Sequence, residues 1–162
     1  MKYHFKFRSY IPLTVIFSLI IAFVLIKALI SDNFTSPSLM LDFMAGFFLV
    51  FGGFKTIKLP AFAEAYEMYD VIAKKSKIYA YIYPFIEIGL GLAFLFRFEV
   101  ITAAWITLVL MLINSVGAYN GIRDKKVLMC ACLGSVFKLP MSFVSLGEDL
   151  LMAVMAFMII WG

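Results

Sequence analysis

The run IPLTVIFSLIIAFVLIKALI, at residues 11–30, decides the fold class, because it holds a single charged residue, Lys27. A helix needs about 20 mostly apolar residues to cross the hydrocarbon core of a bilayer. Four further runs of similar character follow, at residues 39–57, 78–98, 100–119 and 141–161. Backbone in lipid must satisfy its own hydrogen bonds, and the alternation typical of barrel strands is absent, so each run is predicted to be a helix. The sequence predicts an all-α fold, a polytopic membrane helical bundle with five spans.

The overall composition supports the same class. Of 162 residues, 64% are hydrophobic and 15% are charged, and the mean hydropathy is +1.01. A soluble domain is closer to half apolar and a quarter charged. A water-soluble fold with this composition would expose large apolar patches. We therefore expect one domain whose main partner is the lipid bilayer.

The basic residues predict the orientation of the bundle. Twelve of the 14 lie on one side of the predicted spans: three before the first, five between the second and third, and four between the fourth and fifth. Only Lys27 and Arg97 fall on the other side. The positive-inside rule therefore predicts a cytoplasmic N-terminus and a C-terminus outside. The net charge of +4 then reflects topology, and no nucleic-acid partner is expected. The first run is expected to be an uncleaved anchor, because no small-residue cleavage site follows it.

The longest predicted loop, residues 58–77, carries apolar side chains at helical spacing. We expect a short amphipathic helix at about residues 60–76, lying in the cytoplasmic headgroup layer with its aromatic stripe as the membrane anchor. Asp70 and Lys74 are spaced to form an i,i+4 ion pair on this helix. The predicted stripe consists of Phe62, Tyr66, Tyr69 and Ala73.

The stretch VLMCACLGSVFKLP, at residues 127–140, contains the only two cysteines of the chain, Cys130 and Cys132. Residues two apart point to nearly opposite sides of a helix, so a regular helix would separate the thiols. Gly134 permits unusual backbone angles, and Pro140 suits the first turn of the next helix. We predict an irregular hairpin at the membrane face that lets the two sulfur atoms meet.

Three interpretations of this thiol pair stay open from the residues alone. The two thiols form a strained, easily reduced disulfide, or they bind a soft metal ion as thiolates with Met129 and Met141 as secondary ligands. The third interpretation is that both are small buried apolar side chains. No cofactor is required by any motif, and the single histidine, His4, excludes a two-histidine haem site within one subunit.

Ionisable residues inside the predicted spans are candidate functional residues, because charge is costly in lipid. Glu87 lies near the middle of the third span, between Pro84, which is expected to kink the helix, and the pair Gly89 and Gly91, which is expected to allow close helix approach. Glu148 and Asp149 lie about two turns into the fifth span. Lys55 is expected to extend to the membrane surface and Asp42 to reach water.

We expect Glu87 and Glu148 to share one level of the bundle beneath the cysteine stretch, because both are approached from the cytoplasmic ends of their helices. Asn114, in the inner half of the fourth span, is expected to join them by a hydrogen bond. The group then acts either as a relay that carries protons to and from the thiols, or as a set of interhelical hydrogen bonds that stabilises the bundle.

A set of these residues resembles the MauE/DoxX family of redox-associated membrane proteins, most closely its MauE branch. The resemblance covers residues 39–161, so that 39–162 are identified as a four-helix domain and 1–38 as an added tail and anchor helix. Leu133 stands where the family usually has Phe. The matching positions are Gly52, Lys55, Phe62, Tyr69, Pro84, Glu87, Gly89, Cys130, Cys132 and Gly134.

The resemblance implies thiol-disulfide work in a bacterial inner membrane, such as support for maturation of the methylamine dehydrogenase small subunit. The first hypothesis is a thiol-redox protein, a component of thiol-disulfide exchange, in which Cys130 and Cys132 exchange electrons with a thioredoxin-like partner and Glu87 and Glu148 manage protons. The second is a soft-metal carrier that uses the same thiols and a metal-binding protein partner. The third is a non-catalytic membrane assembly factor.

Overall fold

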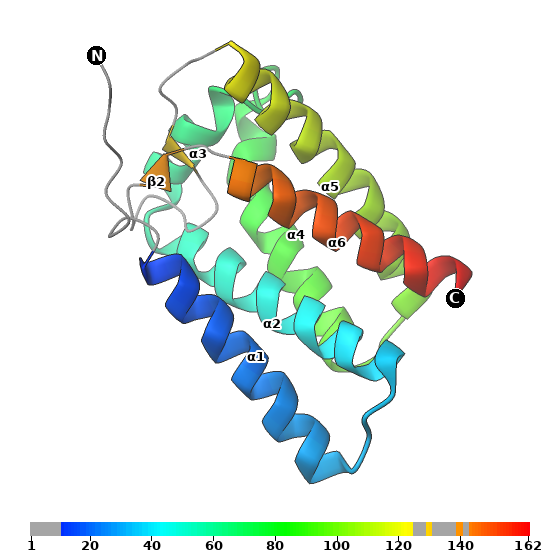
Figure 1. Cartoon of the computed structure of the whole chain (residues 1–162). Helices are drawn as coiled ribbons and strands as arrows, with labels where there is room; N and C mark the ends of the chain where they lie inside the picture. Colours follow the sequence, from blue (N-terminus) through cyan, green and yellow to red (C-terminus); the bar gives the residue numbers. More distant parts are fainter. Residues whose placement is uncertain (1–10, 125–128, 131–138, 141–142) are drawn as a thin grey trace.

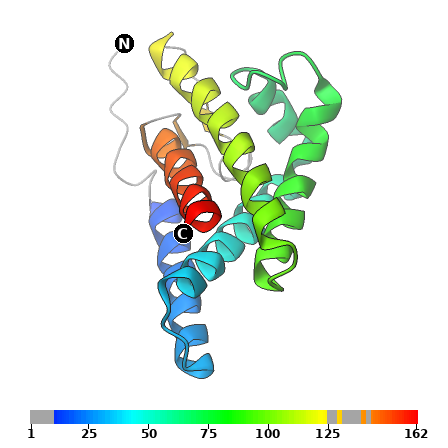
Figure 2. The same ribbon diagram turned by 90° about the vertical axis from the view of Figure 1, so that its right-hand side faces the viewer.

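The computed structural model describes residues 11–124, 129–130, 139–140 and 143–162. Two short strands, β1 (Met129–Cys130) and β2 (Leu139–Pro140), pair antiparallel before the last helix. Figures 1 and 2 show these strands close to the start of α6. The helices are α1 (Ile11–Ser31), α2 (Ser36–Ile57), α3 (Leu59–Glu67), α4 (Lys77–Leu95), α5 (Val100–Arg123) and α6 (Phe143–Trp161).

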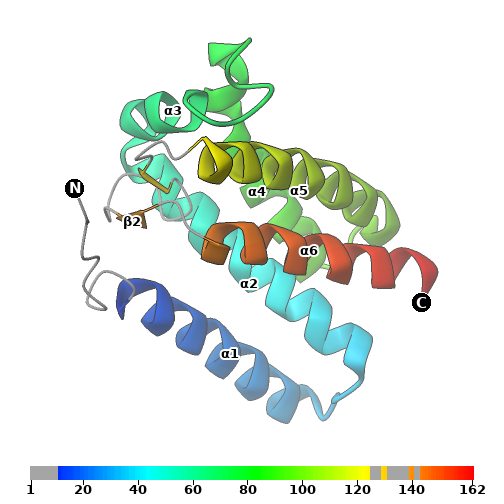
Figure 3. The ribbon, with the colours of Figure 1, turned by 45° about the horizontal axis from the view of Figure 1, so that its top comes forward.

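The long helices form an antiparallel bundle that confirms the predicted all-α polytopic fold. Within the described residues, α1, α2, α4 and α5 are long and apolar enough to cross a membrane. The fifth predicted span corresponds to α6, whose 19 residues extend about 28 Å at 1.5 Å per residue. The helices pack in pairs, α1 on α2, α2 on α4 and α5 on α6. Figures 2 and 3 show α1 on the outer side of α2, with α5 beside α6.

The two ends of the bundle differ in charge. We call one end the basic end, since it contains the start of α1, the helix α3 and the start of α6 as well as a group of basic residues. The opposite end holds the α1–α2 and α4–α5 connections. The described basic residues of the basic end, apart from Lys55 in α2, are Lys58, Lys74, Lys75, Lys77 and Arg123.

Local sequence features explain where the spans begin. Pro37 lies in the first turn of α2, where its missing N–H would have no helical partner. Ser76 caps α4, and its hydroxyl accepts a hydrogen bond from the backbone N–H of Tyr79 at 3.4 Å. Between α4 and α5 the chain reverses through Arg97 and Glu99, which have φ angles of 57° and 43°. This left-handed geometry is unfavourable for side-chain-bearing residues, so the turn depends on contacts that hold Arg97 in place.

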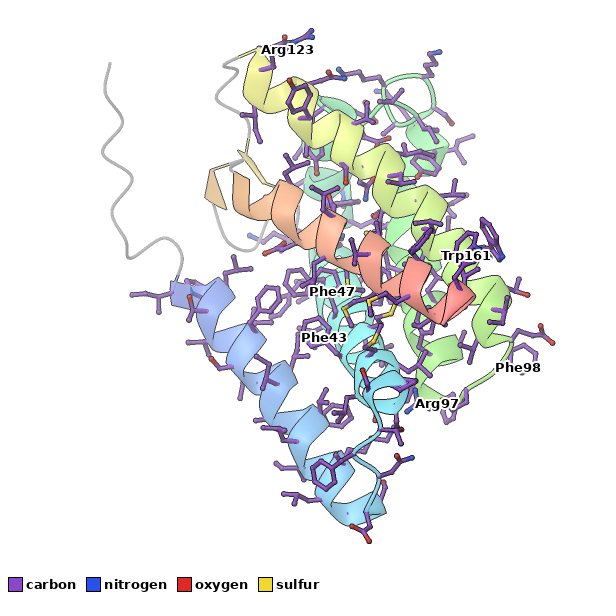
Figure 4. All side chains as sticks on the ribbon, turned by 45° about the vertical axis from the view of Figure 1, so that its right-hand side comes forward. Phe43, Phe47, Arg97, Phe98, Arg123 and Trp161 are labelled. Carbon is purple, nitrogen blue, oxygen red and sulfur yellow. The ribbon has the colours of Figure 1, made fainter. Side chains whose placement is uncertain are left out.

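Asp42 provides the contact that holds this turn. Its Oδ1 lies 2.7 Å from Arg97 Nη2 and 2.5 Å from Lys27 Nζ, so one carboxylate binds both basic residues of the opposite end. Arg97 also donates hydrogen bonds to the carbonyl and hydroxyl oxygens of Ser38. Figure 4 shows Arg97 at the end of the molecule away from Arg123. Asp42 is only 3% exposed, so the expectation that it reaches water is wrong: its two cations replace water as partners.

Aromatic packing joins α1 to α2. The Phe17 ring of α1 lies 6.2 Å from Phe43, 6.0 Å from Phe47 and 5.8 Å from Phe51, measured between ring centroids. Phe47 and Phe51 stack at 4.3 Å. Figure 4 shows Phe43 and Phe47 directed from α2 toward α1. These contacts, together with the Lys27–Asp42 ion pair, attach α1 along the length of α2.

Of the two glycines predicted to bring helices together, only one does so. A Cβ at Gly91 would lie 2.8 Å from Leu49 Cγ, so α4 approaches α2 closely there because the side chain is missing. A Cβ at Gly89 would meet nothing within 4 Å, so the expectation for this glycine is wrong. The helix α4 runs without a break through Pro84.

Replacing Asp42 with Ala should destabilise the bundle. The change leaves Lys27 and Arg97 without their shared counter-ion, but both side chains are about one-third exposed, so we expect a loss of about 1–3 kcal/mol in the free energy of unfolding. Denaturant unfolding in detergent micelles, followed by circular dichroism, measures this loss. The matched control is Asp124→Ala, since the Asp124–Arg123 pair is exposed and 3.6 Å long and should contribute under about 0.5 kcal/mol. Equal losses in the two variants would contradict the assigned role of Asp42.

Candidate functional site at the basic end

The centre of the site is an ion pair between α2 and α4. Lys55 Nζ lies 2.6 Å from Glu87 Oε1 and 2.7 Å from Oε2, and the two residues are 7% and 1% exposed. Gly52, one turn before Lys55, allows this pairing, because a Cβ there would lie 3.0 Å from an Ile88 side-chain carbon and 3.2 Å from the Pro84 carbonyl. Lys55 therefore points into the bundle toward Glu87, and the expectation that it extends to the membrane surface is wrong.

Two aromatic rings complete the surroundings of the Lys55 ammonium group. Its nitrogen lies 5.0 Å from the Tyr83 ring centroid and 5.7 Å from that of Phe62. A cation over an aromatic face is attracted by the negative charge of that face, and more strongly when water is absent. The ammonium group thus has a carboxylate and two ring faces as its partners, from α4 and α3.

The helix α3 covers the basic end of the bundle, and it is shorter than expected. It ends at Glu67, and residues 68–75 continue as hydrogen-bonded turns, so the predicted helix over 60–76 is wrong in its second half. The predicted membrane-anchoring stripe is also wrong, because its members face the protein interior instead of the headgroups. All four of these side chains are buried: Phe62, Tyr66, Tyr69 and Ala73.

Asp70 explains why the helix ends. Its Oδ1 accepts hydrogen bonds from the backbone N–H groups of Ile72 at 2.9 Å and Ala73 at 2.8 Å, which stabilises a turn. The side chain is fully buried, so the predicted ion pair with Lys74 is wrong. Gly117 of α5 lies against this turn, where a Cβ would be 2.9 Å from the Tyr69 carbonyl oxygen. The glycine therefore lets the turn sit directly on α5.

Asn114 links three helices through tyrosine hydroxyls. Tyr66 Oη donates to Asn114 Oδ1 at 2.7 Å, and Asn114 Nδ2 donates to Tyr83 Oη. Burial raises the pKa of Tyr66 well above its ordinary value of 10.0, so the donor is the neutral hydroxyl. The partners of Asn114 are thus two tyrosines. The sequence had instead suggested the carboxyl groups of Glu87 and Glu148. Tyr83 in turn interacts electrostatically with Glu87, which connects the amide to the ion pair.

The carboxyl groups of α6 approach the same cation. Lys55 interacts electrostatically with both Glu148 and Asp149. Glu148 is 7% exposed, and its Oε1 has no hydrogen-bond partner within the described residues. Asp149 is half-buried. Lys55 thus contributes to the electrostatic surroundings of both Glu87 and Glu148, and the expected grouping of the two carboxyl groups stays a prediction.

The cysteine stretch is described only in part. Residues 129–130 and 139–140 form a two-stranded antiparallel pair, in which Met129 lies opposite Pro140 and Cys130 opposite Leu139. The backbone at Cys130 is thus extended, as the predicted hairpin requires, and β2 leads within three residues into α6. Cys132, Gly134 and Met141 lie outside the described residues, so the proposed disulfide and metal ligand set remain predictions. Among the residues that are described, no three His, Cys, Asp or Glu side chains cluster closely enough to hold a metal ion.

These features define a polytopic membrane protein with a buried ion pair beneath a covering helix. Residues 36–162 match the family described as methylamine utilisation protein MauE, and the chain belongs to that family. The match contains every residue of the site and leaves α1 outside it. No curated protein and no solved structure matches the chain.

Sequence reasoning missed the aromatic part of the site, which is formed by Phe62, Tyr66 and Tyr83. One signal was available, because Tyr79, Tyr83 and Glu87 recur at i, i+4 and i+8 and so share a face of α4. A polar stripe on an otherwise apolar span indicates a face turned toward protein. Nothing in the spacing of α3 distinguishes burial against the bundle from burial in the headgroup layer.

A double-mutant cycle tests the buried ion pair. Lys55→Met and Glu87→Met should each lower the free energy of unfolding by about 3–5 kcal/mol, because each leaves an unpaired charge in the bundle. The double variant should lose much less than the sum of the two, since no charge remains. Lys58→Met removes an exposed cation at the same end and serves as the control. Additive losses would show that the two side chains do not pair.

A pair of tyrosine variants tests the Asn114 contacts. Tyr66→Phe removes the donor to Asn114 and should lower the free energy of unfolding by about 1–3 kcal/mol, because the amide oxygen is left buried without a partner. Tyr81→Phe is the control, since Tyr81 lies on the exposed side of α4. Chemical unfolding in detergent compares the two, and an equal effect of both changes would count against the Tyr66–Asn114 bond.

Proposed function

We propose that this MauE-family protein is a membrane thiol-redox protein that exchanges electrons with a thioredoxin-like partner through Cys130 and Cys132. Oxidation of the dithiol forms one S–S bond and releases two electrons and two protons, which reduce a disulfide of the partner to two thiols. By this exchange the protein supports maturation of disulfide-containing envelope proteins. The family description suggests methylamine dehydrogenase as one such protein.

The observation that carries the proposal is the extended pairing of Cys130 with Leu139 immediately before α6. This pairing supports a hairpin in which two thiols separated by one residue can approach each other. It also connects the cysteine stretch directly to the helix that bears Glu148, eight residues beyond Pro140.

The buried charges supply the second part of the proposal. A thiol attacks a disulfide only as its thiolate, so exchange requires a group that accepts the thiol proton. Glu87 is engaged by both of its oxygens with Lys55, whereas Glu148 has an oxygen without a partner in the described structure. Glu148 is therefore the proton acceptor that we assign to the thiols, and Glu87 fixes the position of Lys55.

The orientation is part of the same proposal. With the basic end in the cytoplasm of a bacterial inner membrane, the N-terminus is cytoplasmic and the C-terminus outside. The hairpin then faces a compartment that keeps thiols reduced. Electrons pass at this side between the dithiol and the thioredoxin-like partner.

Trapping in intact cells tests the thiol chemistry. Alkylation before and after addition of an oxidant should show Cys130 and Cys132 shifting together from the reduced to the oxidised form. Replacing one of the two cysteines with Ser should leave a mixed disulfide with the partner that a reductant releases, because the resolving thiol is missing. Met129→Leu is a control that would impair a metal carrier and leave thiol exchange unchanged. A pair that stays reduced under oxidant would contradict the proposal.

The role of Glu148 has its own test. Glu148→Gln should slow disulfide exchange by roughly a hundredfold near neutral pH, since general base assistance to the thiol is lost. The matched control is Glu64→Gln, an exposed carboxyl of α3 at the same end of the bundle, which should leave the rate unchanged. Rates are measured by quenched alkylation of the purified full chain. Equal rates in wild type and the Glu148 variant would remove Glu148 from the proposed chemistry.

A further inference from the structure

We propose that a groove between α1 and α2 binds one anionic phospholipid, with an acyl chain in the groove and the phosphate group on Lys58. The site contains neither cysteine and none of the buried carboxyl groups, so this inference is independent of the proposed thiol chemistry. The groove has a volume of about 440 Å³, and its lining is entirely apolar. The lining includes Leu19, Ile20, Phe23, Gly46, Val50 and Phe54.

The groove lies beside a close approach of two antiparallel helices. Figure 3 shows α1 and α2 side by side, running in opposite directions. A Cβ at Gly46 would lie 3.1 Å from Ile20 Cγ2, so α1 packs directly on α2 at this glycine. Val50 and Phe54 follow one and two turns later on α2, and the space between them and α1 forms the groove.

The groove is open on the side that faces lipid. Both of its helices are long and apolar enough to cross a membrane. On α1, the rim residues Leu19 and Phe23 are 64% and 45% exposed. Exposed apolar side chains in the middle of a membrane span contact acyl chains, so a lipid chain enters the groove from the bilayer without crossing a polar layer.

A basic residue stands at the end of the groove. Gly46, Val50, Phe54 and Lys58 are each four residues apart, so they follow one face of α2 to its end at the basic end of the bundle. Lys58 is exposed, and none of the ion pairs among the described residues includes it. Lys55, one turn earlier, is bound to Glu87. Lys58 is therefore the cation of this helix end that is available to a lipid phosphate.

The charge and shape of the groove favour an anionic lipid over a second protein helix. Helices associate in lipid mainly through small residues that let their backbones approach. Gly46 is already covered by Ile20 of the same chain, and the rim presents the larger side chains of Leu19 and Phe23. A narrow, flexible acyl chain fills such a groove. The lysine at its end distinguishes an anionic headgroup from a zwitterionic one.

Native mass spectrometry of the purified full-length protein in detergent tests the site. The probe is phosphatidylglycerol, and the comparison is phosphatidylethanolamine with the same acyl chains. We expect one phosphatidylglycerol to be retained per chain, with an affinity roughly fivefold higher than that of phosphatidylethanolamine, as expected for one lysine at the headgroup level.

A lysine pair tests the headgroup contact. Lys58→Met should abolish the preference for phosphatidylglycerol, so that the two lipids are retained equally. Lys77→Met is the matched control, since it removes an exposed cation at the start of α4, at the same end of the bundle, and should leave the preference unchanged.

A valine pair tests the acyl-chain contact. Val50→Phe should lower the affinity for both lipids by about tenfold, because the larger ring takes the space and the contacts of the acyl chain. Val109→Phe is the matched control on the exposed side of α5, where Val109 is 52% exposed. Leu19→Trp fills the same groove from its rim, so the test does not depend on the folding of one variant, which circular dichroism in detergent verifies.

Four results would overturn the inference: equal retention of the two lipids by the wild type, a preference that survives Lys58→Met, retention that neither groove-filling variant lowers, and a dimer that Val50→Phe dissociates. The last result would make the groove an interface between two copies of the chain. Failure of the thiol chemistry leaves the inference intact, since the variant with both cysteines changed to Ser should retain phosphatidylglycerol as the wild type does.

Discussion

The Lys55–Glu87 ion pair is the constraint on which the rest of the basic end depends. An ion pair this deeply buried gives up the hydration of both groups, and its mutual attraction offsets that cost only when the geometry is good. The observed geometry is good, since the ammonium nitrogen lies within 2.7 Å of both carboxylate oxygens and against two aromatic rings. Each neighbouring feature follows from this requirement. Gly52 lets α2 approach α4 at this level, and Phe62 brings α3 over the cation. Apolar residues of similar size would hold two helices together at less cost, so a buried charge here is better explained by chemistry than by stability.

The tyrosines and Asn114 extend this constraint to the covering helix. Because Asn114 bonds to Tyr66 of α3 and Tyr83 of α4, the position of α3 is fixed relative to the helix that carries Glu87. Asp70 and Gly117 then seat the following turn on α5. The basic end is consequently covered by α3 above the ion pair, and a lateral groove beside Glu148 lies between α1 and α6, both of which contact α2.

The fold could be predicted from the sequence, because runs of about 20 apolar residues leave few alternatives in a bilayer. The residues of the site could be predicted in part. Glu87 and Glu148 could be identified as charged residues in apolar segments. Their partners could not be identified from the sequence. Lys55 and Asp42 both lie near helix ends, where extension to water and inward pairing are equally compatible with the sequence. Which of the two occurs depends on contacts between residues far apart in the sequence. Glu87 is 32 residues from Lys55, and Arg97 is 55 residues from Asp42. The prediction that the aromatic stripe of α3 anchors it in the membrane was wrong for a related reason. Apolar periodicity shows that a face is buried, but not whether lipid or protein buries it.

The Asp42 cluster gives the added helix α1 a role in the charge asymmetry of the molecule. Lys27 and Arg97 are the basic residues that the sequence places away from the basic end, and both are bound to one carboxylate. The carboxylate therefore offsets one of these two positive charges, so that the opposite end adds less positive charge than the lysines around α3. The same carboxylate ties α1 to α2 and holds the strained turn at Arg97. A single buried aspartate thus connects the attachment of α1 on α2 with the conformation of the turn between α4 and α5.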